Sequence, residues 1–388
     1  MTEMAGATGE TEETKAIGET GQARATASTG AAAPRARAAN TGSVPQVPVP
    51  GQAHSVLAYG LPAPDALARA RLLVAPSLDG GLVRELERVA GRPAEPLTDV
   101  PPPSDVPLLC VGGTLPDALR TDRLLWFHSV NAGTDPLLSG GSWPAPALLT
   151  RTVGRMGERM AQYVLAWMLA EGQAVPEFTA QHARAHWERL PSELVAGQTA
   201  LIYGTGRIGA AVGRLLGACG VRTVGVARTT RSGPAPGSAR VVPGSARVVP
   251  GFDRVIGAAE DTGVLAEARW VISTLPLTVA TEGFFGAARF AVVRGATFVN
   301  VGRGATVDMA ALEAALRDGR LRRAVLDVLP AEPAAPGDPV WKLPRTVVTS
   351  HSSGITTDED VAVDFTACWE AVAAGRRPEL TVDVGRGY

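Results

Sequence analysis

The 388-residue sequence has little cysteine, almost no net charge and no long apolar run. Its three cysteines, Cys110, Cys219 and Cys368, are far apart and form no CxxC pair, which argues against a zinc site and against a disulfide framework. Lys and Arg (37) balance Asp and Glu (38). A net charge of -1 gives no electrostatic case for binding nucleic acid or an anionic membrane. No apolar stretch reaches the roughly 18 residues that a spanning helix needs.

The N-terminal segment lacks the features of a signal peptide and of a folded domain. It begins with an acidic, polar stretch and has neither a basic start nor an apolar core, so we expect a cytoplasmic protein. Residues 1–50 contain no Leu, Phe, Trp, Tyr or Cys. Such a segment cannot bury enough apolar surface to offset its ordering entropy, and we expect it to be a disordered tail.

Apolar runs separated by helical patterns begin near residue 54. Short runs at 70–76, 106–113 and 123–129 are bounded by Pro, Gly and Asp, as buried strands of a parallel sheet would be. A helical pattern at 79–91 lies between two of them, which predicts a small α/β domain. A long apolar-periodic helix at 156–172 is expected to lead into a second domain.

A second α/β series follows this helix. Strands are predicted at 198–203, 222–227, 269–275, 295–301, 323–328 and 345–350. A helix is predicted at 309–318, with Asp308 as its N-cap and Gly319 just after its end. A seven-residue unit is written twice at 237–251, and we interpret this duplication as a lengthened surface loop.

A glycine-rich turn follows the first strand of this series and precedes a helix. It consists of Gly204, Thr205, Gly206, Arg207, Ile208 and Gly209. In this strand–turn–helix context, Gly204 permits a tight turn, Gly206 lets the backbone approach a pyrophosphate, and Gly209 allows close packing. The helix N-terminus then offers free N–H groups to phosphates. The alternative is a glycine turn that binds nothing, and we favour a dinucleotide site.

The end of the next strand bears on the choice of cofactor. An NAD site usually has an acid there, which binds the ribose 2′-OH. This sequence has Arg228, Thr229 and Arg231 instead. Because arginine pairs well with phosphate, the pattern favours NADP over NAD, although Arg228 as a merely solvated charge is the alternative.

Three ionisable residues follow later strands, namely Arg303, Glu332 and His351. In an open α/β sheet, ligands bind outside the carboxyl ends of the strands, so the three side chains can converge. A cation can bind a carboxylate and polarise a carbonyl, an imidazolium can donate a proton, and a carboxylate can orient the imidazole. The set suits reduction of a 2-oxo acid.

From about residue 54 onward, the sequence resembles the D-isomer-specific 2-hydroxyacid dehydrogenase family. The resemblance rests on five ordered motifs: GTGRIG, STLPLTVATEGFF, VNVGRGATVDMAAL, AVLDVLPAEP and TSHSSG. It implies that Arg303 binds substrate carboxylate, that His351 is the acid/base and that Glu332 pairs with it. Ser350 stands where the family usually has proline. The stretches 148–169 and TVDVGRGY look most like the glyoxylate/hydroxypyruvate reductase branch, which commonly uses NADPH.

The resemblance also implies an architecture and further site residues. The implied fold is α/β, with two Rossmann-like, doubly wound parallel-sheet domains. Residues 51–170, completed by 355–388, would form the substrate domain, and 171–354 the dinucleotide-binding domain. Further cofactor contacts are expected at Thr274, Leu275, Pro276, Val301, Gly302, Asp327 and Ser353. The substrate loop is expected to hold the carboxylate with the backbone N–H groups of Val130, Asn131, Ala132 and Gly133.

The other histidines give no comparable pattern. We expect His54, His128, His182 and His186 to be surface or packing residues and expect no metal site, since the i, i+4 pair at 182 and 186 lacks a third ligand.

We therefore expect an enzyme, an NAD(P)-dependent oxidoreductase that reduces small 2-oxo acids such as glyoxylate or hydroxypyruvate to D-2-hydroxy acids. We expect a homodimer. One alternative is an NAD-linked D-2-hydroxyacid dehydrogenase acting on phosphoglycerate or D-lactate. The other is a non-catalytic, nucleotide-sensing binding protein similar to the corepressors of this family.

Overall fold

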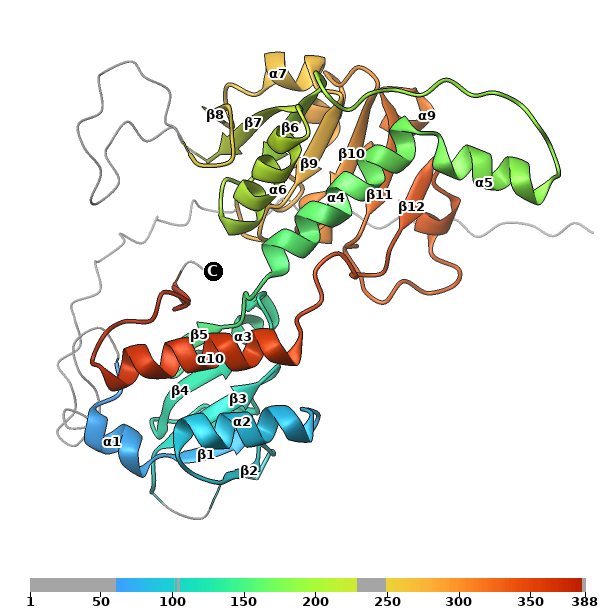
Figure 1. Cartoon of the computed structure of the whole chain (residues 1–388). Coiled ribbons are helices and arrows are strands. Elements are labelled where there is room, and N and C mark those ends of the chain that lie inside the picture. The colour runs from blue at the N-terminus through green and yellow to red at the C-terminus, as the bar shows by residue number, and fades with distance from the viewer. Residues whose placement is uncertain (1–60, 101, 103–104, 229–248, 386–388) are drawn as a thin grey trace, which may run out of the picture. The chain divides into compact units, whose positions relative to one another are not determined.

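A computed structural model shows two parallel β-sheets with helices packed on their faces (Figure 1). The structure describes residues 61–100, 102, 105–228 and 249–385. The predicted tail of residues 1–50 and most of the 237–251 duplication therefore lie outside the described residues. In these ranges, no helix combines the length and apolar character needed to cross a membrane.

The first sheet has five strands in the order β2-β1-β3-β4-β5, and each neighbouring pair is parallel. The strands are β1 (Arg71–Val74), β2 (Ala94–Pro96), β3 (Leu108–Gly112), β4 (Leu124–Ser129) and β5 (Leu148–Arg151). Alternate residues of β3 enter different apolar clusters: Leu109 lies in one, and Leu108 and Cys110 in the other. Because side chains of a strand alternate between faces, the sheet is covered on both sides.

Four helices and a 3-10 turn pack around this sheet. They are α1 (Pro64–Arg69), α2 (Gly80–Ala90), η2 (Asp117–Leu119), α3 (Asp135–Ser139) and α10 (Asp358–Ala373). The Asp79 carboxylate caps α2 by accepting a hydrogen bond from the N–H of Gly81. Gly91 adopts a left-handed φ of 66° just after the helix, a conformation that costs glycine little.

The C-terminal helix α10 completes the core of the first sheet. A capping box formed by Thr357 and Asp360 begins it. Phe365 and Val372 belong to the same apolar cluster as Trp126 of β4. The Phe365 ring stacks on Trp126 at 5.5 Å between centroids, and α10 lies beside α2 (Figure 1). The last helix, α10, therefore packs with the first sheet and α2, which come much earlier in the sequence.

The second sheet has seven parallel strands in the order β12-β11-β10-β9-β6-β7-β8. They are β6 (Thr199–Tyr203), β7 (Arg222–Ala227), β8 (Arg254–Gly257), β9 (Trp270–Ser273), β10 (Ala296–Asn300), β11 (Leu321–Leu326) and β12 (Thr346–Val348). The strand order reverses between β6 and β9, and ligands of open α/β sheets bind at the carboxyl ends of strands near such a reversal.

The helices around the second sheet lie before and between its strands in sequence. They are α4 (Met156–Gly172), α5 (Val175–Ala183), α6 (Arg207–Ala218), α7 (Thr262–Glu267), α8 (Ala287–Phe290), η3 (Gly304–Thr306), α9 (Met309–Arg317) and η4 (Pro339–Lys342). α4 packs along α6 (Figure 1), and Met160, Val164 and Met168 enter the cluster beneath them.

The predicted fold class is confirmed, because both sheets are parallel and covered by helices. The helix α4 has the predicted bounds, and Asp308 caps α9 by accepting from the N–H groups of Ala310 and Ala311. Three strands were not predicted: β2, β5 and β8. Each is only three or four residues long and contains a polar or proline residue, so its apolar run is too short to be recognised.

Candidate active site

The glycine-rich turn joins β6 to α6. Gly204 has a φ of 102°, and a Cβ there would lie 2.5 Å from Oγ1 of Thr274. A Cβ on Gly209 would collide with the carbonyl oxygen of Gly204. The N-cap residue Gly206 offers no side-chain bond, so the first N–H groups of α6 stay available. The turn therefore fits a dinucleotide pyrophosphate, and it includes Thr205, Arg207 and Ile208, which were predicted to line that site.

The end of β7, where an acid would bind the ribose of NAD, has no carboxylate among its described residues. Arg228 follows the strand directly and is exposed. Thr229 and Arg231, which were predicted to stand beside it, lie outside the described residues. Among the residues that the structure describes, Arg228 is therefore the cation at the end of β7.

The loops after β9 and β10 pack against each other. The Thr274 hydroxyl donates to the carbonyl of Tyr203 at 2.9 Å. A Cβ on Gly302 would lie 2.5–2.7 Å from backbone atoms of Leu275, which precedes Pro276. Val301 is buried. The structure thus brings together the predicted cofactor residues of these two loops and the glycine turn.

Asn300 fixes the loop that carries Arg303, and the sequence analysis did not single it out. It is fully buried, its Oδ1 accepts from the N–H of Gly302 at 3.1 Å, and its Nδ2 donates to the carbonyl of Arg303 at 3.1 Å. A lone amide at the end of a buried apolar strand was the available signal, because such a group needs hydrogen-bond partners.

The Arg303 guanidinium is held by one carboxylate and one carbonyl. Its Nε lies 3.2 Å from both carboxylate oxygens of Asp135, and its Nη2 lies 3.1 Å from Oδ1. Its Nη1 donates to the carbonyl of Gly302 at 2.9 Å. Asp135 begins α3 and was not predicted. Since a guanidinium has five N–H donors, one hydrogen on Nη1 and one on Nη2 remain for a ligand.

His351 and Glu332 form a hydrogen-bonded pair. Nδ1 of His351 lies 2.7 Å from Oε2 of Glu332, and the other carboxylate oxygen of Glu332 accepts from the N–H of Leu329 at 2.7 Å. The His351 side chain is 55% exposed, and that of Glu332 is 35% exposed. With Nδ1 engaged, Nε2 is the imidazole nitrogen that can meet a substrate.

Asp327 organises the loop that presents His351. Its buried carboxylate accepts from the Thr349 hydroxyl at 2.6 Å, from the N–H of Ser352 at 2.8 Å, and from the N–H and hydroxyl of Ser353. Asp327 was predicted as a cofactor contact; in this structure its hydrogen bonds go to residues of the loop.

The backbone of this loop is left-handed at two residues. Ser350 has a φ of 54° and His351 a φ of 57°. Proline is fixed near –65°, so the serine that replaces the usual family proline suits this conformation. Left-handed backbone at ordinary residues is uncommon and often occurs at functional sites.

The substrate loop after β4 uses part of its backbone internally. The N–H of Val130 donates to the carbonyl of Gly112 at 3.1 Å, and that of Asn131 donates to the Ser129 hydroxyl at 3.2 Å. Within the described residues, the N–H groups of Ala132 and Gly133 make no hydrogen bond. Of the four N–H groups predicted to bind a substrate carboxylate, two therefore have partners within the protein and those of Ala132 and Gly133 have none among the described residues.

His128 and His186 have protein partners, His182 is exposed, and His54 lies outside the described residues. His128 is buried, and its two ring nitrogens lie 2.8 and 3.1 Å from the hydroxyls of Thr150 and Thr152. Burial lowers its pKa to about 3, so it is neutral at pH 7. His186 is near Glu188 at 3.3 Å. Across the described ranges, no cluster of three His, Cys, Asp or Glu residues could hold a metal ion.

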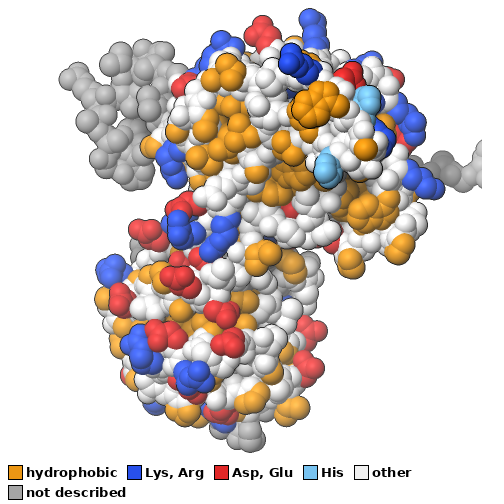
Figure 2. Space-filling model, turned by 45° about the vertical axis from the view of Figure 1, so that its right-hand side comes forward, with side chains coloured by type: hydrophobic (Ala, Val, Ile, Leu, Met, Phe, Trp, Pro, Cys, Tyr) orange, Lys and Arg blue, Asp and Glu red, His pale blue; other side chains and the backbone are white. Residues whose placement is uncertain are grey.

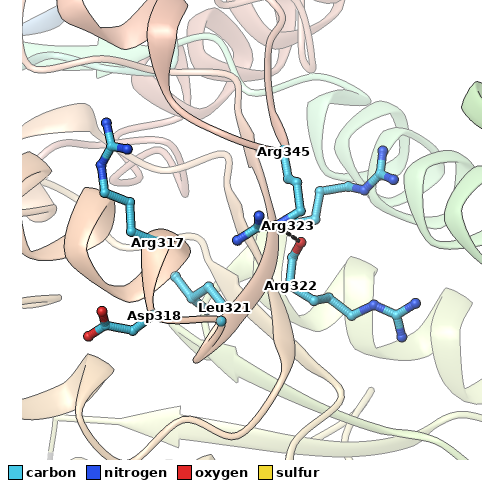
Figure 3. Close-up of a pocket in the computed structure, with 7 residues that line it drawn as sticks. Arg317, Asp318, Leu321, Arg322, Arg323 and Arg345 are labelled. Carbon is cyan, nitrogen blue, oxygen red and sulfur yellow. Dashed lines mark hydrogen bonds between the residues drawn. The ribbon is translucent and has the colours of Figure 1, made fainter.

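A pocket at the amino ends of β11 and β12 lies at the edge opposite this set (Figure 3). It is lined by Arg317, Asp318, Gly319, Leu321, Arg322, Arg323 and Arg345. Its arginines already have partners: Arg322 is paired with Glu193, Arg323 with Glu177, and Arg317 with Glu313. Arg345 donates to the carbonyls of Arg322 and Leu316. We therefore assign these cations a structural role.

Comparisons with known proteins agree with this arrangement. Residues 165–353 match the family model of the NAD binding domain of D-isomer specific 2-hydroxyacid dehydrogenases. The chain is 55% identical over 285 residues to the uncharacterized protein in the mprR 3′ region of Streptomyces coelicolor, covering 73% of this chain and 97% of that protein. It is 28% identical over 274 residues to glyoxylate/hydroxypyruvate reductase A of Serratia proteamaculans (strain 568), covering 69% and 82%.

A solved structure extends the similarity to both sheets. The D-isomer specific 2-hydroxyacid dehydrogenase of Xanthobacter autotrophicus Py2, in complex with NADPH and MES, is 27% identical, with a TM-score of 0.70. The match covers 82% of this chain and 100% of that one. The chain therefore belongs to the family of D-isomer specific 2-hydroxyacid dehydrogenases, which are NAD(P)-dependent oxidoreductases acting on CH–OH groups.

Proposed function

We propose that this enzyme reduces small 2-oxo acids of the glyoxylate or hydroxypyruvate type to D-2-hydroxy acids, with NADPH as the favoured cofactor. The observation that carries the proposal is the 2.7 Å pair between His351 and Glu332, on the same sheet edge as Arg303. In this proposal residues 51–170 and 355–388, which carry the first sheet and α10, form the substrate domain, and α4 at the end of the first range packs against α6 of the second sheet. Residues 171–354 form the cofactor domain.

Arg303 binds the substrate carboxylate in this scheme. Its two remaining N–H groups, one on each terminal nitrogen, suit a carboxylate or the carbonyl oxygen beside it. The N–H groups of Ala132 and Gly133 supply further donors to the same carboxylate. A Cβ on Gly133 would collide with Nη2 of Arg303, so only glycine there lets the loop approach the guanidinium this closely.

His351 donates the proton from Nε2 to the carbonyl oxygen as the carbon is reduced. Glu332 accepts a hydrogen bond from Nδ1, which fixes the ring orientation and leaves Nε2 for the substrate. When bound, NADPH supplies the hydride. The protein residues orient the acceptor carbonyl and balance the charge that develops on its oxygen.

The preference for NADPH rests on the strand end at Arg228. A guanidinium there can pair with the 2′-phosphate of NADP, and the missing carboxylate removes a repulsion against it. The NADPH complex of the Xanthobacter relative supports the same choice. The proposed cofactor contacts are Gly204–Gly209, Thr274–Pro276, Val301, Gly302, Asp327 and Ser353, with Thr229 and Arg231 beside Arg228.

The test measures nicotinamide absorbance with glyoxylate or hydroxypyruvate and either cofactor. We expect oxidation of NADPH to exceed that of NADH, and we expect Arg228→Gln to raise the KM for NADPH about tenfold while leaving that for NADH nearly unchanged. Arg222→Gln, at the other end of β7, is the matched control. A preference for NADH would contradict the role of Arg228. Absence of turnover with every 2-oxo acid, despite NADPH binding, would favour a nucleotide-sensing binding protein.

We also propose that this protein forms a homodimer. Leu169 of α4 and Val175 and Phe178 of α5 expose 43–49% of their surface. Figure 2, which brings the side of α5 forward, shows hydrophobic side chains on the surface of the part that holds the seven-stranded sheet. Exposed apolar patches of this kind are typical of association surfaces. Analytical ultracentrifugation tests this, with a concentration-independent monomer as the contradicting result.

A further inference from the structure

Arg151 lies near enough to Arg207 and Arg303 to interact with their charges, and the three arginines differ in their partners. Arg303 is paired with Asp135, and Arg207, the first residue of α6, is 3.4 Å from Glu379. Arg151 is the last residue of β5, and its Nη1 donates to the carbonyl of Ala132 at 3.1 Å. Within residues 61–100, 105–228 and 249–385, no carboxylate forms an ion pair or hydrogen bond with Arg151.

Arg151 is also partly removed from water. Burial lowers the pKa of its guanidinium, and the positive charges of Arg207 and Arg303 lower it further. A cation that has lost part of its hydration and stands near like charges is costly unless an anion accompanies it. The described part of the chain supplies no such anion to Arg151, whereas it supplies one to each of its two neighbours.

The loop brings Arg151 and Arg303 to adjacent residues. Arg151 is bonded to the carbonyl of Ala132, while the Arg303 guanidinium lies directly against the backbone of Gly133. One guanidinium is enough to bind one carboxylate in a bidentate manner. A substrate such as glyoxylate, which has a single carboxylate, would leave the second guanidinium without an anion.

We infer that Arg151 binds a second anionic group of the substrate, at the end of the carbon chain remote from the carboxylate that Arg303 holds. This inference rests on the proposed function, since it assigns the other end of the same substrate. The preferred substrates are then 2-oxo acids with two acidic groups, of which 2-oxo dicarboxylates are the simplest. Arg151 acts as a specificity-determining residue and takes no part in hydride or proton transfer.

The experiment compares 2-oxo dicarboxylates with 2-oxo monocarboxylates of the same chain length. kcat/KM is measured with NADPH for oxaloacetate against 2-oxobutyrate, and for 2-oxoglutarate against 2-oxopentanoate. We expect kcat/KM for the dicarboxylate to exceed that for its monocarboxylate counterpart about tenfold or more in at least one pair. In Arg151→Gln this ratio falls to about one, and in Arg151→Lys, which keeps the charge, a substantial part of it returns.

Two further measurements separate specificity from loss of structure. Arg155→Gln, an exposed arginine paired with Glu158, is the matched control and should keep the wild-type ratio. Calorimetric binding of D-malate to the protein with NADP should weaken about tenfold in Arg151→Gln, while binding of D-2-hydroxybutyrate changes much less.

The outcomes distinguish this inference from the proposed function. Turnover of 2-oxo monocarboxylates with no preference for either dicarboxylate would overturn the role of Arg151 and leave the proposed function intact. An equal loss for all substrates in Arg151→Gln, with a raised KM for NADPH, would also overturn it, because it would place Arg151 at the cofactor phosphates. Absence of turnover with any 2-oxo acid would overturn both.

Discussion

The charged side chains at the two edges of the seven-stranded sheet differ in their burial and in their hydrogen-bond partners. At the amino edge, Glu171 is only 5% exposed and is bonded to Arg269 at 2.7 Å and to the Thr297 hydroxyl at 2.8 Å. Arg322 lies 3.2 Å from the same carboxylate. At the carboxyl edge, His351 is more than half exposed and follows a left-handed serine.

This difference separates groups that hold the fold from groups that can act on a ligand. Charges at the amino edge satisfy one another, so a ligand has little to gain there, even beside the arginine-lined pocket. At the carboxyl edge, the Nε2 of His351 and two N–H groups of Arg303 keep unused hydrogen-bonding capacity. The comparison predicts that substitutions at the first edge affect stability, whereas those at the second affect activity.

The largest effect is expected for His351→Ala. Loss of the proton donor should lower kcat with glyoxylate or hydroxypyruvate by about 10²–10⁴-fold, a typical contribution of general acid catalysis. Because the side chain is largely exposed, the melting temperature should change little. Steady-state kinetics and thermal unfolding check both parts. His186→Ala, another exposed histidine paired with a glutamate, is the control, and retention of most activity in His351→Ala would refute the assignment.

Glu171→Ala should destabilise the fold at the amino edge of the seven-stranded sheet. Removal of this carboxylate leaves Arg269, whose side chain is 16% exposed, without its principal partner, which should lower the free energy of unfolding by about 3–5 kcal/mol. Urea unfolding measures this loss, and kcat of the folded fraction should remain near that of the wild type. The control is Glu177→Ala, because this 45% exposed partner of Arg323 should contribute about 1 kcal/mol or less. Equal losses in both variants would contradict the distinction.

Asp327→Asn tests whether a buried acid at the carboxyl edge serves activity. The carboxylate accepts four hydrogen bonds from the loop that carries His351. An amide can accept only on its oxygen and would face the Ser353 donors with its N–H₂ group. We expect kcat to fall about tenfold through misplacement of His351, with a smaller change in KM. A loss of stability with unchanged kcat would place Asp327 with the amino-edge residues instead.

Much of the comparison could be predicted from the sequence, because strand ends in a parallel sheet follow from the order of apolar runs. Arg303, Glu332 and His351 were proposed as site residues on that basis, and the structure pairs Glu332 with His351. Asp135 was not, because its contact with Arg303 joins residues 168 positions apart and no local pattern encodes it. The use of the Val130 and Asn131 N–H groups within their own loop also depends on tertiary geometry. Short strands such as β8 lacked a sufficient apolar run.

Asp360 lies in α10 beside the first sheet, and its carboxylate is fully hydrogen-bonded. It tests whether such a carboxylate makes the stability of the fold depend on pH in acid. Burial alone would raise its pKa, but hydrogen bonds from Arg159, Thr357 and Arg155 outweigh burial and lower the pKa to about 2. Because the folded pKa lies below the unfolded value of 3.8, the stabilisation is complete above pH 3.8 and is lost as the pH falls towards 2.

Asp360→Asn should therefore lower the free energy of unfolding by about 2 kcal/mol at pH 7, and the difference from the wild type should shrink between pH 4 and pH 2. Urea unfolding at several pH values measures this. Asp358→Asn, in the same first turn but without these bonds, should show a smaller and less pH-dependent change. A deficit for Asp360→Asn that stays constant down to pH 2 would mean that packing, and not charge, accounts for its contribution. Charged groups with all their partners, such as Asp360, would then differ from the partly unpaired groups at the carboxyl edge only in burial.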